Sequence, residues 1–210
     1  MEHDFWHARW SEGRIGFHEG VPNEHLVTHA ARLAGAKRLL VPLCGKAEDL
    51  AWLASPEGGA HEVVGVELVE RAVQDFFAEH AHTPAVTREG PLTRYQSGAV
   101  TVFAGDFFAL TPAQLGPVDG FYDRAALIAL PAPMRPRYVQ HLRALLPKGA
   151  PGLLVSVEYP QAQLEGPPFS VPEDEVGSHW TGAKRLGSVP ARGGRLEKLP
   201  ATEKCFFVET

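Results

Sequence analysis

The stretch that decides the fold is Arg38-Leu-Leu-Val-Pro-Leu-Cys-Gly-Lys46. Its run to Leu43 is apolar on both faces, as expected of a strand buried in a parallel sheet. The run feeds a tight turn, in which Gly45 allows the backbone to approach a ligand closely. Because a helical stretch to about Ala54 follows, the segment predicts the first strand–turn–helix unit of an α/β fold.

The same alternation of strand and helix continues along the chain. Residues 61–66 predict a second strand that stops at Glu67. Strands alternating with helices predict a parallel sheet with helices on both faces, and ligands bind such sheets at the carboxyl ends of the strands. The other expected elements are helices at 23–33, 69–80 and 133–146, strands at 100–103, 118–122 and 152–157, and a final edge strand at 204–208.

Size and charge limit the classes of function. The 210 residues fit one domain, which we expect to span 1–210. A formal net charge of −5 with no block of basic residues argues against a nucleic-acid partner and against an electrostatic membrane anchor. No apolar run approaches the roughly 20 residues of a membrane span, and the acidic, aromatic N-terminus does not resemble a signal peptide. We therefore expect a cytoplasmic protein without a membrane partner.

Cysteine and histidine spacing predicts no metal site. Cys44 and Cys205 are the two cysteines, and neither sits in a disulfide or zinc pattern. The pair His25/His29, like a second pair near the N-terminus, has the spacing of metal ligands on a helix. However, no H-E-x-x-H motif accompanies it, and no third ligand is apparent.

The end of the second strand predicts a nucleoside cofactor. Glu67 lies 22 residues beyond Gly45, where nucleotide-binding α/β folds place the carboxylate that accepts hydrogen bonds from ribose hydroxyls. The phosphate-binding patterns are missing, because there is no G-x-G-x-x-G and the Walker motif fails at Leu40 and Ala47. This disfavours an NAD-dependent oxidoreductase and favours a cofactor without phosphates, of which S-adenosylmethionine is the commonest. Glu67 as a mere cap of the following helix is the alternative interpretation.

Several motifs resemble the thiopurine S-methyltransferase family, in the family's order and over about 170 residues. The motifs are WHARW (6–10), IGFH (15–18), PLCGK (42–46), HEVVGVE (61–67), YDRAAL (122–127) and EYPQ…GPPFSVPEDEV (158–176). The resemblance implies a Rossmann-like methyltransferase fold with a mostly parallel seven-stranded sheet and helices on both faces. It also implies transfer of a methyl group from S-adenosylmethionine to a sulfur, which leaves S-adenosylhomocysteine. Bacterial members are associated with thiopurines and with selenium or tellurium compounds.

Matching positions imply which residues form the site. Residues 1–22 would form a lid, with Trp10 packed over the cofactor; core packing of the N-terminal tryptophans is the alternative. Arg124 would lie near the methionine end or the substrate and act in catalysis, unless it forms only an ion pair with Asp123 or Asp119. The other implied residues are Leu43, Gly45, Glu67, Asp106 and Phe107 for the cofactor, and Phe17 and Phe169 for the substrate.

The implied chemistry needs orientation more than acid–base help. A thiol of low pKa ionises near neutral pH, so the site has to hold the nucleophile and the methyl group in line in a water-poor pocket. The positive charge of Arg124 favours a thiolate or selenolate. We expect a monomer acting on a small soft nucleophile. Two other functions remain open: a halide or small-thiol methyltransferase, and a non-catalytic metalloid-resistance protein that binds S-adenosylmethionine.

The chain after residue 176 departs from the family pattern. After EDEV (173–176) the family has a longer helix and a longer stretch before the last strand. Here the region is short and contains several glycines and prolines. The departure affects the side of the sheet that shapes the acceptor pocket, so it bears on the acceptor more than on the cofactor.

Overall fold

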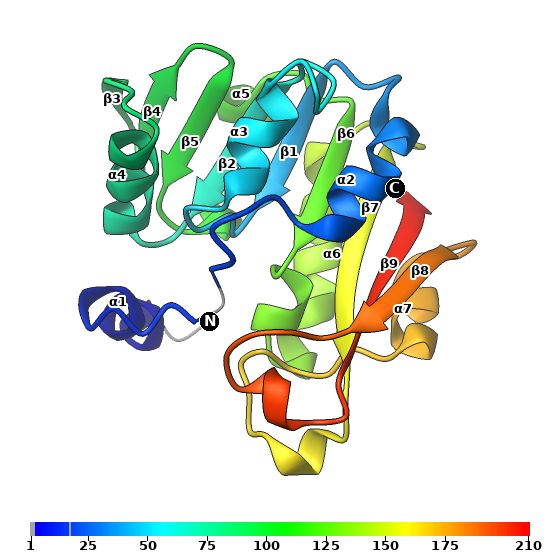
Figure 1. The fold of residues 1–210 in the computed structure, drawn as a ribbon. Coiled ribbons are helices and arrows are strands. Elements are labelled where there is room, and N and C mark those ends of the chain that lie inside the picture. Colours follow the sequence, from blue (N-terminus) through cyan, green and yellow to red (C-terminus); the bar gives the residue numbers. More distant parts are fainter. Residues whose placement is uncertain (1–2, 17) are drawn as a thin grey trace.

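A nine-stranded sheet forms the centre of the computed structural model, which describes residues 3–16 and 18–210 (Figure 1). The strand order is β3-β4-β5-β2-β1-β6-β7-β9-β8. Neighbours from β5 to β7 are parallel, whereas β4 and β9 run antiparallel to the strands beside them. The strands are β1 (Arg38–Pro42), β2 (Glu62–Glu67), β3 (Ala85–Glu89), β4 (Leu92–Ser97), β5 (Val100–Ala104), β6 (Gly120–Arg124), β7 (Pro151–Glu158), β8 (Lys184–Pro190) and β9 (Thr202–Glu209).

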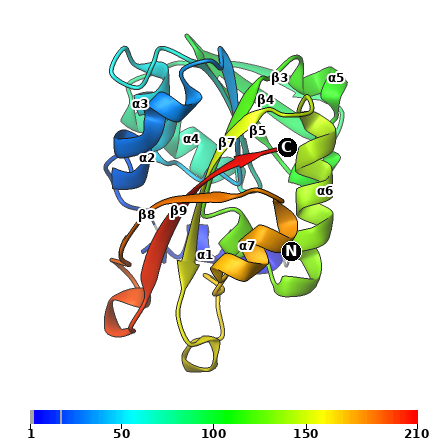
Figure 2. The ribbon, with the colours of Figure 1, turned by 90° about the vertical axis from the view of Figure 1, so that its right-hand side faces the viewer.

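Helices cover both faces of this sheet. Figure 2 shows α2, α3 and α4 on one side of it and α6 and α7 on the other. The α-helices are α1 (His3–Ser11), α2 (Glu24–His29), α3 (Glu48–Ala54), α4 (Glu70–Glu79), α5 (Pro112–Leu115), α6 (Arg135–Leu145) and α7 (Glu173–His179). Short 3-10 helices occur at η1 (Ala30–Leu33), η2 (Phe107–Ala109), η3 (Leu127–Ala129), η4 (Ala132–Met134), η5 (Gln161–Gln163) and η6 (Leu196–Lys198).

The alternation of side chains along β1 explains why it is apolar on both faces. Leu39 and Val41 pack into the core under α2, α3 and α4, whereas Leu40 packs into the core under α6 and α7. All three side chains are at most 2% exposed. The strand thus contributes to both hydrophobic cores, which is the arrangement that the PLCGK-containing stretch predicts.

The sheet differs from the expected one at its two ends. The hairpin β3–β4 adds two strands beyond β5, and β9 is an inner strand because β8 pairs along its other side. Both added edge strands lack the pattern that identifies a strand: β3 is mostly exposed, with Val86 at 55%, and β8 contains a glycine at a register shift after Arg185. The expectation of seven strands, and of an edge strand at 204–208, was therefore wrong.

None of the helices in the described residues is long and apolar enough to cross a membrane. The longest helix, α6, has 11 residues, and a spanning helix needs about 20.

Candidate active site

A cavity of about 590 Å³ lies at the carboxyl ends of the central strands. The turn after β1, the end of β2 and the end of β6 form its floor, and Leu43, Glu67 and Arg124 line it. The N-terminal segment, the loop between β8 and β9, the 3-10 helix η3 and the loop with Pro167 and Pro168 contribute to the other walls. In Figure 1, α1 lies apart from the sheet, beyond the lower ends of β2 and β1.

The turn after β1 has an unusual backbone. Leu43 and Gly45 both have positive φ, 49° and 56°, and the Cys44 N–H donates to the carbonyl of Val66 over 3.0 Å. A left-handed conformation is strained for leucine, and such strain concentrates at functional sites. A Cβ built on Gly45 would lie 3.4 Å from the Trp10 ring. The turn therefore exposes the main chain of Gly45 to the cavity, and the Trp10 ring packs against it.

Glu67 is fixed by the main chain around it. Its Oε2 accepts a hydrogen bond from the Gly45 N–H over 2.8 Å, and its Oε1 accepts one from the Val69 N–H over 2.8 Å. The side chain is buried, and burial raises the pKa of Glu67 even though these donors lower it. A carboxylate has about four lone-pair positions, so each oxygen retains capacity to accept a ligand hydroxyl.

These features fit a nucleoside without phosphates. Glu67 supplies acceptors for a pair of hydroxyls, and Trp10 and Leu43 supply apolar surface beside it. Cys44, also in the lining, is 5% exposed, and burial together with Glu67 raises the pKa of its thiol well above the ordinary value. Cys44 is thus a buried neutral thiol.

The N-terminal segment packs closely over this end of the cavity. Trp10 is 7% exposed and packs with Val69 and Ala72 at the start of α4. Trp6 and Ile15 pack against the same small cluster. Trp10 therefore packs in a small core cluster and also lines the cavity, and its expected role over the cofactor remains a prediction.

Arg124 lies among carboxylates rather than at the surface. It forms an ion pair with Glu19, and not with Asp123 or Asp119. Burial alone would lower the pKa of Arg124, but Glu19 and Asp49 outweigh burial and raise it. Arg124 is therefore a permanent cation in the wall of the cavity.

Three of the groups around Arg124 were missed from the sequence. Asp49 is 2% exposed, accepts a hydrogen bond from the Asn23 N–H over 2.7 Å, and has its pKa raised by burial to about 6. Glu203, from β9, accepts one from the Asn23 Nδ2 over 3.0 Å. Glu19, Asp49 and Glu203 come from three distant segments, so no local motif could have grouped them.

Asp123, which precedes Arg124 in the chain, accepts hydrogen bonds from main-chain N–H groups. Its Oδ1 accepts hydrogen bonds from the Ala126 and Leu127 N–H groups over 3.2 Å, and its Oδ2 accepts one from the Tyr138 hydroxyl over 2.7 Å. Burial raises the pKa of Asp123 to about 6. Asp123 thus anchors the turn that follows β6.

The remaining predicted residues lie elsewhere. Asp106 caps η2 by accepting from the Phe108 N–H, and Phe107 is 2% exposed in the core against Tyr138; neither lines the cavity. Phe169 is outside the lining too, although Pro167 and Pro168 before it belong to it. Phe17 lies outside the described residues. The roles expected of these four residues remain predictions.

Arginines surround the outer part of the cavity. Arg9 and Arg14 come from the N-terminal segment, and Arg192 and Arg195 from the loop before β9. Arg14 forms an ion pair with Glu12. The arginines lie close enough together that Arg14 and Arg195 lower the pKa of Arg9, after the effect of burial. This wall is positive in a chain whose net charge is negative.

Sequence comparisons place the chain beside named methyltransferases. Residues 1–196 match the thiopurine S-methyltransferase family. A thiopurine S-methyltransferase from Pseudomonas aeruginosa (strain UCBPP-PA14) is 50% identical over 188 residues, which is 89% of this chain and 85% of that protein. One from Xanthobacter autotrophicus (strain ATCC BAA-1158 / Py2) is 48% identical over 216 residues, covering 100% of this chain and 99% of that protein.

A structural comparison supports the fold. The structure of Burkholderia thailandensis 1,6-didemethyltoxoflavin-N1-methyltransferase, solved with 1,6-didemethyltoxoflavin and S-adenosylhomocysteine bound, superposes with a TM-score of 0.64 at 16% identity. The match covers 99% of this chain and 86% of that one. The α/β methyltransferase fold expected from the sequence is thus confirmed.

Proposed function

Because this chain belongs to the thiopurine S-methyltransferase family, we propose that it methylates a small thiolate or selenolate, using S-adenosylmethionine as the donor. The observation that carries the proposal is one cavity with two unlike ends. At one end Glu67 and the turn after β1 fit a nucleoside, and at the other Arg124 is a cation whose side chain is 13% exposed. A donor site beside a cation suits transfer to an anionic nucleophile.

The donor end uses few side chains. Glu67 would hold the ribose hydroxyls, the backbone at Gly45 would approach the donor, and Trp10 and Leu43 would cover its apolar surfaces. The positively charged sulfonium of S-adenosylmethionine supplies an activated methyl group. The chain itself has to bind, orient and exclude water, and the packing of Trp10 against the turn supports the last of these.

The acceptor end of the cavity supplies the positive charge of Arg124 to the bound acceptor. Arg124 would stabilise the ionised acceptor and lower its pKa, which makes a separate general base unnecessary. The outer arginines favour an acceptor that carries further negative charge. His18 also lines the cavity; burial, and then Lys46, lowers its pKa, so at neutral pH it adds no positive charge.

The organisation of the protein is part of the same proposal. We propose one domain over residues 1–210 that acts as a cytoplasmic monomer, with residues 1–22 as a lid. The cavity walls come from the N-terminal segment, the central strands and the loop before β9 of one chain, which supports a site that needs no second subunit.

The test is calorimetric titration with S-adenosylmethionine and S-adenosylhomocysteine, followed by an acceptor panel. The panel pairs aromatic thiols with small thiols, halide ions and selenols, at matched concentrations. We expect micromolar binding of both cofactor forms and turnover with thiolates or selenolates. Binding without turnover on any acceptor would favour a non-catalytic protein, and turnover limited to halides would favour the halide enzyme; either result would refute the proposal.

A further inference from the structure

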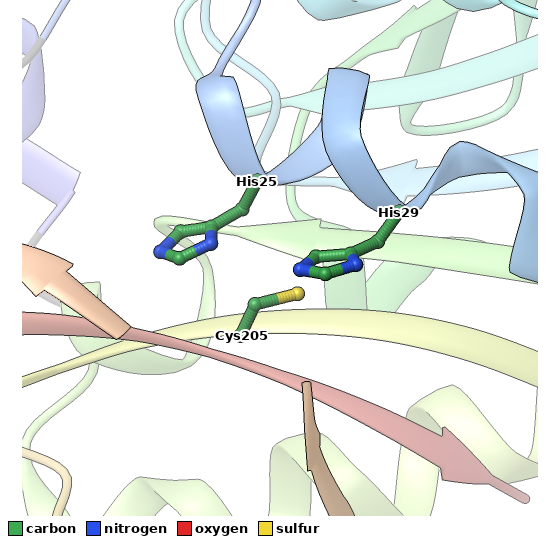
Figure 3. A group of neighbouring side chains, drawn as sticks. All are labelled: His25, His29 and Cys205. Carbon is green, nitrogen blue, oxygen red and sulfur yellow. The ribbon is translucent and has the colours of Figure 1, made fainter. Parts of the chain in front are cut away.

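Three side chains that commonly bind metals meet outside the cavity. His25 and His29 lie on α2, and Cys205 lies on β9; one ligand atom from each falls within 4.8 Å of the others (Figure 3). His25 and Cys205 are buried, at 3% and 0% exposure, while His29 is partly exposed. A solvent ion therefore has a path to the cluster beside His29.

The fold holds the two histidines in one orientation. Residues four apart share a face of a helix, and the two rings stack with centroids 6.2 Å apart and an interplanar angle of 15°. Figure 3 shows both rings above the Cys205 side chain, with the sulfur directed towards His29. The helix thus presents two imidazoles to one point on the sheet.

A glycine leaves room at this point. Gly187 on β8 pairs with Cys205 on β9. A Cβ built on Gly187 would lie 3.3 Å from His29 Nε2 and 3.8 Å from His25 Nδ1. These two nitrogens therefore face the same small space beside the thiol, and any larger residue on β8 would enter it.

The other nitrogen of His25 has the environment of a metal ligand's outer nitrogen. His25 Nε2 is buried and lacks a hydrogen-bond partner within the part of the chain that the structure describes. It lies 3.9 Å from Glu203 Oε1, and Asn23 Nδ2 donates to the same oxygen over 3.0 Å. Metal-bound histidines usually direct their free N–H to a carboxylate, which fixes the tautomer. Glu203 is in position for that role.

We propose that His25 Nδ1, His29 Nε2 and Cys205 Sγ bind a zinc ion, with water as the fourth ligand. Two imidazoles and one thiolate are ligands that Zn²⁺ prefers, and tetrahedral ligands around zinc lie about 3.5 Å apart. Closing the cluster from its present span takes shifts of about 1 Å, within the reach of side-chain rotation. Binding ionises Cys205, and the thiol proton passes to solvent.

The ion would join two parts of the molecule that meet at the cavity. Helix α2 begins directly after Asn23, and β9 carries Glu203 beside Arg124. A bond from α2 through zinc to β9 would fix both groups and thereby one wall of the acceptor end. The sequence showed no third ligand because Cys205 is supplied by a strand far along the chain.

The test uses the full chain, stripped with a chelator and titrated with Zn²⁺ and with Co²⁺ as a spectroscopic probe. We expect one Zn²⁺ per chain with a dissociation constant below micromolar, a higher melting temperature, and a thiolate-to-cobalt charge-transfer band. Cys205→Ser should abolish the band and weaken Zn²⁺ binding at least a hundredfold. Cys44→Ser, the matched control, should retain the band.

A steric variant covers the case in which Cys205→Ser fails to fold. Gly187→Ala adds a methyl group 3.3 Å from His29 Nε2 and 3.8 Å from His25 Nδ1, which narrows the space around the proposed ion and should weaken Zn²⁺ binding tenfold or more. Gly177→Ala on α7, where a Cβ meets nothing within 4 Å, should leave binding unchanged. Absence of stoichiometric binding, preference for Cu⁺ with no Zn²⁺ binding, or equal binding by the two alanine variants would overturn the proposal.

Discussion

The two ends of the cavity are held in place in different ways. At the end formed by β1 and β2, main-chain N–H groups of Gly45 and Val69 fix the single carboxylate of Glu67. At the other end, side chains also contact one another: Arg124 pairs with Glu19 and Asn23 Nδ2 donates to Glu203, while the main-chain N–H of Asn23 donates to Asp49. The hydrogen bonds of the first end join residues 45, 67 and 69, whereas the contacts of the second join residues that range from 19 to 203.

This difference has an energetic consequence. A carboxylate that accepts hydrogen bonds from main-chain N–H groups keeps those donors when neighbouring side chains are substituted, because substitution does not remove the main chain. A cluster of neighbouring charges that are partly or fully removed from water depends on every member, since removal of one leaves the others uncompensated. The donor end should therefore tolerate change around it, whereas the acceptor end should respond as a unit.

The largest effect is expected for Arg124→Met. Removing the cation leaves Glu19, Asp49 and Glu203 close together, so the free energy of unfolding should fall by about 3 kcal/mol. The rate of methyl transfer should fall at least about a hundredfold, or roughly 2.7 kcal/mol. Chemical denaturation and steady-state kinetics measure the two losses.

A double variant separates stability from catalysis. Arg124→Met combined with Glu19→Gln removes one uncompensated charge and should recover part of the stability without recovering the rate. If the double variant recovers the rate too, Arg124 acts only as a structural counter-ion, and its proposed role at the acceptor is wrong.

The same difference explains what could be predicted from the sequence. The turn after β1 and the carboxylate at the end of β2 follow from local patterns: an apolar run, a glycine, and an acid 22 residues later. The central strands and both helical layers follow from the alternation of strand and helix. Glu19, Asp49 and Glu203 could not be predicted as partners of Arg124, because their proximity depends on tertiary packing. The exposed strand β3 lacked the apolar alternation that identifies a strand.

A second prediction concerns Asp123. Like Glu67, it is a buried carboxyl group that accepts hydrogen bonds from main-chain N–H groups. Burial raises its folded-state pKa to about 6 from an ordinary 3.8. Between these values the folded chain keeps a proton that the unfolded chain has released. The contribution of Asp123 to the free energy of unfolding is therefore fully present below pH 4 and is lost as the pH rises to about 6, by roughly 3 kcal/mol.

The test compares the free energy of unfolding of the parent protein with that of Asp123→Asn across a range of pH. The amide does not titrate, so the stability of the parent relative to the variant should decline between pH 4 and pH 6 and stay level above it. Urea denaturation of both proteins across this range gives the difference, in which Asp49 and other titrating groups cancel. A difference that rises with pH would mean that the Asp123 pKa is lowered in the folded chain.

A third prediction addresses the donor end through Glu67→Gln. The amide nitrogen cannot accept, so one backbone N–H or one ribose hydroxyl loses its partner. Affinity for S-adenosylhomocysteine should fall at least about tenfold, or 1.4 kcal/mol, as measured by calorimetry. Glu62→Gln, at the opposite end of the same strand, serves as the control and should bind as the parent does. Equal affinity in both variants would remove Glu67 from the donor site.

The smallest effect is expected at the exposed rim of the acceptor end. Arg195→Gln removes one positive charge from the wall formed by the loop before β9. Because exposed charges are well solvated and screened, KM for an anionic thiol should rise only about twofold, and high salt should abolish the difference. A neutral thiol of similar size should show no change, and neither acceptor should respond to Arg88→Gln on the distant β3–β4 hairpin. A salt-independent rise with both thiols would instead indicate that Arg195 contacts the acceptor directly, which would extend the interdependent cluster around Arg124 out to the rim.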